Sequence, residues 1–148
     1  MGGKIVFEDI DKKSYCMLKP KIHTPICVPT HLLGNAIQPS NFGKTEFLIE
    51  DCCQSLGTRV GQRMVGSFGA MSIFSFQETK HITTLGEGGI IITNNEEFAE
   101  KCRRIRNHGE YYKNDNSIGF NFRLTESQAA FGMAQLKRLP TILKNFRK

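Results

Sequence analysis

The 148-residue sequence contains no apolar run close to the roughly 18 residues that a membrane-spanning helix needs. Its first residues, MGGKIVFEDIDKKSY, lack the charged-then-apolar pattern of a secretory signal, because Glu8, Asp9 and Asp11 interrupt it. There is also no internal repeat and no low-complexity segment. These absences predict a globular protein of the cytoplasm, with no membrane partner.

The sequence has no CxxC pair, and its five cysteines are an odd number. Cys52 and Cys53 are adjacent, which suits neither a knuckle-type metal site nor a disulfide framework. Cys27 and His31 are four residues apart, but Pro29 between them argues against the helix that would align the two side chains. We therefore expect reduced, buried thiols and no metal ion.

The composition is ordinary for one soluble domain, with 39% hydrophobic and 23% charged residues. Twenty basic and 14 acidic residues give a net charge of +6, which would favour an anionic partner. The basic residues are largely dispersed, however, and a solvated helix face is the favoured explanation of those at 101–106, so charge alone does not decide the partner. Because no aromatic-and-basic motif or recognition helix accompanies the charge, we do not expect nucleic-acid binding.

Short apolar runs bounded by turns predict strands that are buried on both faces. They lie at residues 26–28, 47–49, 71–76 and 90–92, with a shorter one at 5–7. Helical patterns come later: one helix follows Asn94–Asn95 and stops at Gly109, and a second begins at Thr125 with Gln128 as a capping box. We expect the second helix to end before Pro140, and a third to begin near Thr141. The sequence ends inside that third helix, so we expect a part of a longer α/β protein.

Several of these predicted strands end in reactive or polar side chains. His31 and Asp51 follow two of them, and Ser75 with Lys80 follows a third. In open α/β sheets, ligands bind beyond the carboxyl ends of the strands. We therefore expect a site at this edge, with His31 as a candidate for contact with the substrate.

Lys80 and Asp51 are the two residues that suggest a particular chemistry. A lysine amine becomes an imine-forming nucleophile where burial or a nearby cation lowers its pKa, although most lysines are simply exposed at the surface. A carboxylate at the mouth of a buried sheet needs a cation, and a protonated pyridine nitrogen would serve; a helix cap is the equally good alternative for Asp51.

Ser75 alternates with Phe74 and Phe76, so it points away from both and could donate to a phosphate. The GEGG stretch at 86–89 precedes a strand instead of following one, and so fails the dinucleotide fingerprint. It predicts a tight turn with close backbone packing.

Taken together, these segments resemble one family, the DegT/StrS group of nucleotide-sugar aminotransferases. The resemblance rests on Asp-x-x-Gln after a strand, Ser-Phe-x-x-x-Lys, Gly-Glu-Gly-Gly and Gly-Phe-Asn-Phe-Arg, in this order, with THLLGN before them. It implies an α/β fold, the large-domain part of the aspartate-aminotransferase-like (fold type I) enzymes, with a mostly parallel sheet and flanking helices. Residues 1–148 would form a partial large domain that binds pyridoxal phosphate, without the N-terminal part and the C-terminal small domain of the family.

The resemblance also implies roles for individual residues. Lys80 resembles the Schiff-base lysine, which also moves a proton between substrate and cofactor. Asp51 resembles the partner of the pyridine nitrogen, Gln54 the side chain beside the ring oxygen, and Ser75 the phosphate-binding serine. Asn121 resembles an asparagine that reaches the phosphate in the neighbouring subunit, so a homodimer is implied.

The implied function is transamination of a nucleotide-linked keto sugar with glutamate as the amino donor, in polysaccharide biosynthesis. A sugar dehydratase on the same scaffold is the alternative enzyme, but there a histidine replaces the lysine, whereas here His81 only follows Lys80. An inactive remnant or interaction module is the alternative outside enzymes. The sequence does not specify the sugar or the nucleotide.

Overall fold

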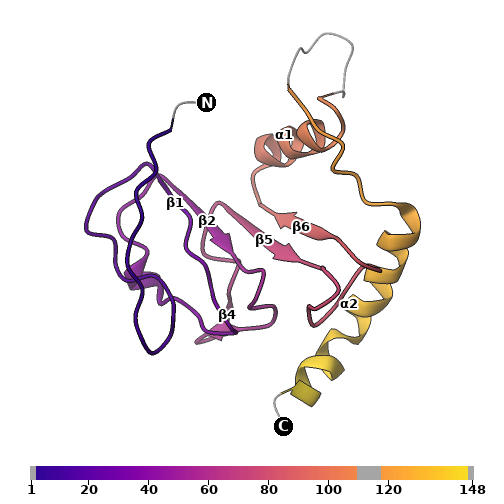
Figure 1. The fold of residues 1–148 in the computed structure, drawn as a ribbon, viewed down its shortest axis with the longest axis horizontal. Coiled ribbons are helices and arrows are strands. Elements are labelled where there is room, and N and C mark those ends of the chain that lie inside the picture. Colours follow the sequence, from indigo (N-terminus) through magenta and orange to yellow (C-terminus); the bar gives the residue numbers. More distant parts are fainter. Residues whose placement is uncertain (1–2, 110–117, 147–148) are drawn as a thin grey trace. The chain divides into compact units, whose positions relative to one another are not determined.

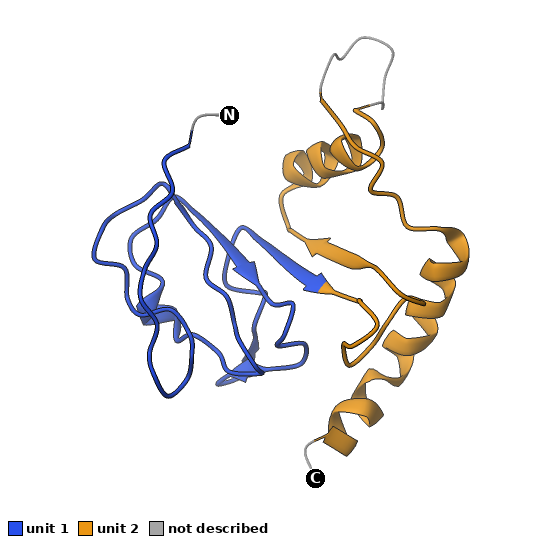
Figure 2. Cartoon of the chain, viewed as in Figure 1, with its two compact units in different colours: residues 1–74 blue, residues 75–148 orange. Residues whose placement is uncertain are grey.

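The computed structural model describes residues 3–109 and 118–146, and the chain divides into two compact units. Unit 1 comprises residues 1–74 and unit 2 residues 75–148 (Figure 2).

Unit 1 is built on parallel strands, as the apolar runs predict. β1 (Ile26–Cys27) pairs with β2 (Phe47–Asp51), and β2 pairs with β5 (Met71–Ser75), whose last residue opens unit 2 (Figure 1). An isolated parallel bridge between Thr30 and Asp51 continues the pairing beyond β1. This bridge places the segment after β1 beside the carboxyl end of β2, where the sequence predicts a site.

Two further elements of unit 1 were not predicted. β3 (Arg59–Val60) and β4 (Arg63–Met64) form an antiparallel hairpin across a turn at Gly61, whose φ is 59°. A single 3-10 turn, η1 (Pro39–Asn41), lies near a small core made of Cys16, Ile37 and Phe42. Both elements are only two or three residues long, too short to leave a periodic pattern in the sequence.

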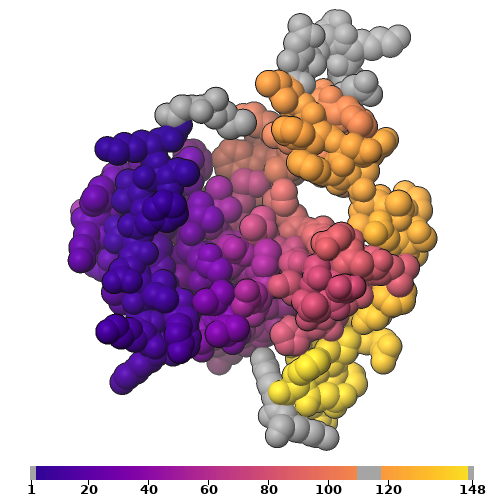
Figure 3. All heavy atoms as spheres, viewed as in Figure 1, coloured from indigo at the N-terminus to yellow at the C-terminus, as the bar shows by residue number. Residues whose placement is uncertain are grey.

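The predicted strand at residues 5–7 is absent from the structure. These residues lie at the surface of unit 1, with the Phe7 side chain 90% exposed (Figure 3, indigo). A short apolar run forms a strand only where a neighbouring strand can pair with it, and among the described residues none pairs with this run.

Unit 2 contains β6 (Gly89–Ile92), α1 (Glu96–Arg106) and α2 (Glu126–Phe146). The start of α1 is as predicted: the Asn95 side chain accepts a hydrogen bond from the Phe98 N–H at 3.1 Å. Glu96 and Glu97 lie in the first turn, where negative charge is favourable.

The capping box of α2 is confirmed, whereas the predicted helix break is wrong. The Thr125 N–H donates to Gln128 Oε1 at 3.1 Å, and the Gln128 N–H donates to Thr125 Oγ1 at 3.3 Å. The helix then runs through Pro140 to Phe146 without ending. Pro140 is exposed, so water can satisfy the Leu136 carbonyl that loses its partner.

β6 also departs from the prediction of strands buried on both faces. Ile90, Ile91 and Ile92 are 42%, 48% and 46% exposed. Burial depends on what packs against a strand, and the described residues cover this one only in part.

Candidate active site

Asp51 ends β2 with its carboxylate held by two donors. Oδ1 accepts from the Cys53 N–H at 3.0 Å, and Oδ2 accepts from the Thr30 hydroxyl at 3.4 Å. Its main chain is fixed as well, because the Asp51 N–H donates to the Pro29 carbonyl and the His31 N–H to the Asp51 carbonyl, both at 2.9 Å. A half-buried carboxylate is therefore presented at the end of a strand in a defined orientation.

Gln54 continues the link between these two segments. Its side-chain oxygen accepts from the Leu33 N–H at 3.3 Å, and its main-chain carbonyl accepts from the Gly34 N–H at 2.9 Å. The structure thus brings the THLLG segment and the Asp51–Gln54 segment together within unit 1, as the arrangement of strand ends predicts.

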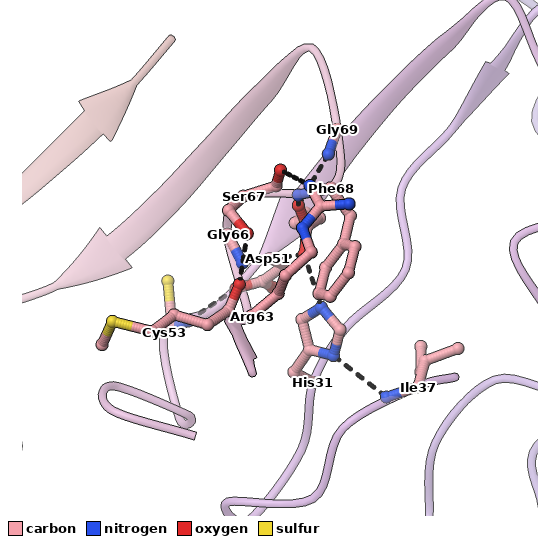
Figure 4. A network of polar contacts seen from close by, with 11 residues as sticks. His31, Ile37, Asp51, Cys53, Arg63, Gly66, Ser67, Phe68 and Gly69 are labelled. Carbon is pink, nitrogen blue, oxygen red and sulfur yellow. Dashed lines mark hydrogen bonds and ion pairs between the residues drawn. The ribbon is translucent and has the colours of Figure 1, made fainter. Parts of the chain in front are cut away.

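The backbone of His31 lies beside that of Asp51, but the His31 side chain does not reach solvent. Its side chain is fully buried, and both ring nitrogens are engaged: Nε2 lies 3.0 Å from Glu50 Oε2, and Nδ1 accepts from the Ile37 N–H at 3.1 Å (Figure 4). The ring therefore has no exposed atom and no spare nitrogen in this structure, and Glu50 is its structural partner. Contact of His31 with a substrate remains a prediction.

That partner, Glu50, is fully buried and accepts four hydrogen bonds. Besides His31, the donors are the backbone N–H groups of Gly66, Phe68 and Gly69, at 2.8, 2.6 and 2.7 Å. Burial alone raises the pKa of the Glu50 carboxyl, but the bonds from His31, Gly66, Gly69 and Phe68 together outweigh it, so the pKa lies below its ordinary value.

Cys52 lies close to this pair, and the three side chains have the identities of metal ligands. The candidate ligand atoms of His31, Glu50 and Cys52 all lie within 4.8 Å of one another. However, burial and then the charge of Glu50 raise the pKa of the Cys52 thiol to about 12, so it stays protonated. Since both Glu50 oxygens already accept two hydrogen bonds each, the arrangement favours a hydrogen-bond network.

In unit 2, Ser75 and Lys80 flank a turn that follows β5. Ser75 is half-buried and its hydroxyl accepts from the Gln77 N–H at 3.3 Å, while Phe74 and Phe76 on the opposite face are buried, as the alternation predicts. The Lys80 N–H donates to the Gln77 carbonyl at 3.0 Å. Within residues 3–109 and 118–146, the half-buried Lys80 amine has no hydrogen-bond or ion-pair partner.

The loop that carries Lys80 is closed at its base. The Phe76 N–H donates to the Gly88 carbonyl at 2.8 Å, and the Thr84 N–H donates to the Phe76 carbonyl at 3.0 Å. Thr84 and Ile82 are each 1% exposed, so the loop is anchored by side chains that point inward. Gly88 lies so close to Thr84 Oγ1 that a Cβ would collide with it, which is the close packing predicted for the GEGG turn.

Asn121 is exposed and lies in the segment before α2. Its side-chain oxygen accepts from Arg123 Nε at 3.0 Å, and its backbone forms an antiparallel bridge with Asn107. The amide of Asn121 is thus oriented by its own neighbour, while its role remains a prediction.

Two residues of this region, Glu50 and Thr30, were not predicted from the sequence. Glu50 offered one signal, since a carboxylate at the second-last position of an apolar strand must find donors if the strand is buried. Three of its four donors come from the glycine-containing turn at 66–69, which no local sequence pattern links to Glu50.

Comparisons with known proteins show the family of the chain. A family model described as the DegT/DnrJ/EryC1/StrS aminotransferase family matches residues 1–148. The chain is 42% identical to GDP-perosamine synthase from Vibrio cholerae, over 97% of this chain and 42% of that protein.

Solved structures agree as well. Helicobacter pylori PseC, an aminotransferase of pseudoaminic acid biosynthesis, superposes with a TM-score of 0.81 at 32% identity, over 92% of this chain and 40% of that chain. GDP-4-keto-6-deoxy-D-mannose-3-dehydratase from E. coli, with bound hydrated PLP, gives 0.80 at 30% identity, over 90% and 42% of the two chains. The chain thus spans about two fifths of the length of the relatives it matches.

Proposed function

This chain belongs to the DegT/DnrJ/EryC1/StrS aminotransferase family, and we propose from that premise that it binds pyridoxal phosphate through Lys80 and serves a sugar aminotransferase. Its fold is that of the fold type I enzymes it superposes on, with a mostly parallel sheet and flanking helices. Because the chain covers only part of its relatives, the activity, substrate and partners are proposals about the whole protein.

The observation that carries the proposal is the amine of Lys80. It lies half-buried in a loop whose base is anchored by Thr84 and Gly88, and no described residue pairs with it. An amine without a counter-charge is available to a carbonyl carbon, with which its neutral form makes an imine and releases water. Such an amine is the nucleophile that forms an imine with the aldehyde of pyridoxal phosphate.

The family resemblance implies roles for the other residues at the same cofactor. The Asp51 carboxylate, oriented by Thr30 and Cys53, would stabilise a protonated pyridine nitrogen. The hydroxyl of Ser75 and the amide of Asn121 would bind phosphate, and Gln54 would lie beside the ring oxygen. When bound, the cofactor supplies an electron sink, while the Lys80 amine carries a proton to and from the substrate carbon.

We propose a nucleotide-linked keto sugar as the amino acceptor and glutamate as the amino donor. Support comes from the names of relatives, which include a GDP-perosamine synthase and a UDP-N-acetyl-3-dehydro-alpha-D-glucosamine 3-aminotransferase. The net charge of +6 suits a substrate that carries a diphosphate.

A dehydratase is the second candidate, favoured by the similarity to GDP-4-keto-6-deoxy-D-mannose-3-dehydratase. The identity of the residue at position 80 weighs against it, because the resemblance assigns a histidine there in dehydratases. His81 does not substitute for it: its ring packs edge-on against Phe146, with centroids 4.9 Å apart.

A cytoplasmic homodimer is the assembly we propose. All five cysteines lie within the described residues and outside any disulfide, which suits a reducing compartment. In the part of the chain that the structure describes, no helix is long and apolar enough to cross a membrane. The exposed amide of Asn121 is available to a neighbouring subunit.

The proposal is tested by borohydride reduction after incubation with pyridoxal phosphate, followed by peptide mapping. Reduction converts the imine into a stable secondary amine, so we expect the added mass on Lys80 alone. Lys80→Ala should lose the label, and Lys101→Ala, which removes an exposed lysine paired with Glu97, should retain it. A folded chain that stays unlabelled, or is labelled at many lysines, would refute cofactor binding and support the inactive-remnant alternative.

A further inference from the structure

Glu50 and Asp51 are consecutive residues of β2, so their side chains point to opposite faces of the strand. Asp51 is the residue with a proposed role at the cofactor. Glu50 has none, yet it is a fully buried carboxylate, and burying such a charge is costly unless it is well paired. Its position next to Asp51 needs a reason.

The hydrogen bonds of Glu50 join three separate segments of unit 1. Oε1 accepts from Phe68 and Gly69, and Oε2 accepts from Gly66 and faces the ring of His31 (Figure 4). Because the Ile37 N–H donates to Nδ1 of that ring, the ring proton lies on Nε2 and points at Glu50. The carboxylate thus fixes the turn before β5 and the THLLG segment at the same time.

The THLLG segment, with Thr30, in turn restrains both the main chain and the side chain of Asp51. The His31 N–H donates to the Asp51 carbonyl, which closes a ring of bonds through Glu50, His31 and Asp51. One residue earlier, the Thr30 hydroxyl donates to Asp51 Oδ2 on the other face of the strand. Residues 30–31 therefore hold residues 50–51 by hydrogen bonds on both faces of β2.

We propose that Glu50, His31 and Thr30 are positioning residues for Asp51, which set the place and direction of its carboxylate for the cofactor. This inference rests on the proposed function, since Asp51 needs positioning only if it serves a ligand. A small displacement of a group that must meet one ring nitrogen weakens the interaction strongly.

A purely stabilising role predicts something different. If the buried pair only holds unit 1 together, its loss lowers stability and leaves cofactor affinity in the surviving folded protein unchanged. The test therefore needs a readout at the cofactor, which the absorbance of bound pyridoxal phosphate and its dependence on pH provide.

The experiment compares four variants of the 148-residue chain with the wild type at a temperature where each is folded by circular dichroism. His31→Leu removes the donor to Glu50, and His31→Gln restores a donor close to the position of Nε2. Thr30→Val removes only the hydroxyl on Asp51. Cys16→Ala changes a buried core side chain that takes no part in the hydrogen bonds of Glu50, His31, Thr30 and Asp51, so it is the matched control for a loss of stability.

We expect His31→Leu to raise the Kd for pyridoxal phosphate roughly tenfold or more and to move the pH midpoint of the bound cofactor's absorbance. His31→Gln and Cys16→Ala should stay close to the wild type in both, and Thr30→Val should move the midpoint. A wild-type Kd and midpoint in folded His31→Leu would overturn the inference. If that variant does not fold, an unchanged Thr30→Val overturns it instead. A wild-type chain that takes no label at Lys80 contradicts the proposed function itself, and with it this inference.

Discussion

At the scale of single residues, the buried carboxylate of Glu50 makes the stability of unit 1 depend on pH. Its pKa lies below the ordinary value of 4.5 in the folded chain, because four donors outweigh its burial. A depressed folded pKa means that the folded state holds the proton less tightly than the unfolded state. The stabilisation is therefore fully present above pH 4.5 and is lost as the pH falls towards the folded pKa.

We expect Glu50→Gln to lose about 3 kcal/mol of unfolding free energy at neutral pH, because the new amide cannot accept from every donor around it. The difference from the wild type should narrow as the pH falls below 4.5, where the wild-type carboxyl takes up a proton on unfolding. Urea denaturation at a series of pH values measures both effects. A difference that stays constant down to acid pH would show that the carboxylate charge contributes nothing.

At the scale of elements, α2 is held against the Lys80 loop by a glycine. Gly132 is buried in the middle of the helix, and a Cβ there would lie 2.7 Å from Thr84 Cγ2. Thr84 is buried and short, so it cannot move aside as a long side chain would. The contact is the reason why this helix tolerates glycine, which costs about 1 kcal/mol relative to alanine in a helix interior.

Gly132→Ala should therefore destabilise the protein by about 1–3 kcal/mol, although alanine is the better helix former. Adding Thr84→Ser removes the clashing methyl group and keeps the hydroxyl that donates to the Glu87 carbonyl at 2.9 Å, so the double variant should regain stability relative to Gly132→Ala. Thermal unfolding of both single variants and the double variant gives the coupling. Simple additivity of the two changes would mean that the clash is relieved elsewhere.

Pro140 provides a second test of α2. It lies inside one continuous helix, where proline is about 3 kcal/mol less favourable than alanine, and it is exposed. We expect Pro140→Ala to raise the unfolding free energy, by up to about 3 kcal/mol, with little change in helical content measured by circular dichroism. If the helix instead ended before Pro140 and a new one began there, proline would be well placed and the substitution would give no gain.

These elements also show which parts of the structure can be predicted from the sequence. Local signals were sufficient for the strands that contain Phe47 and Met71 and for both helix starts, since a cap or an apolar run needs only its immediate neighbours. The prediction failed where the outcome depends on distant partners, since the run at 5–7 found no strand to pair with. The contact of His31 with Glu50 likewise depends on a partner that no local pattern indicates. The roles of Lys80, Asp51, Gln54, Ser75 and Asn121 come from family resemblance, and no contact in the structure tests them.

At the scale of the whole molecule, the proposed homodimer predicts a result that a site formed by a single chain would not give. If each site takes Lys80 from one subunit and Asn121 from the other, then Lys80→Ala and Asn121→Ala remove the contributions of different subunits to that site. A mixed dimer of the two variants has one site with both changes and one site with neither. Random reassociation makes half of the dimers mixed, so about a quarter of the wild-type sites should be restored.

The measurement is borohydride labelling of Lys80 at a low concentration of pyridoxal phosphate, where Asn121→Ala alone binds weakly. Each variant by itself should label poorly, and a mixture that has been unfolded and refolded together should label more than the average of the two. The same mixture combined without unfolding is the control, since existing dimers then exchange slowly. Labelling equal to the average after reassociation would place Lys80 and Asn121 in the same subunit's site, or show that Asn121 does not bind the cofactor. A gain would establish that the exposed amide of Asn121 acts across a subunit boundary.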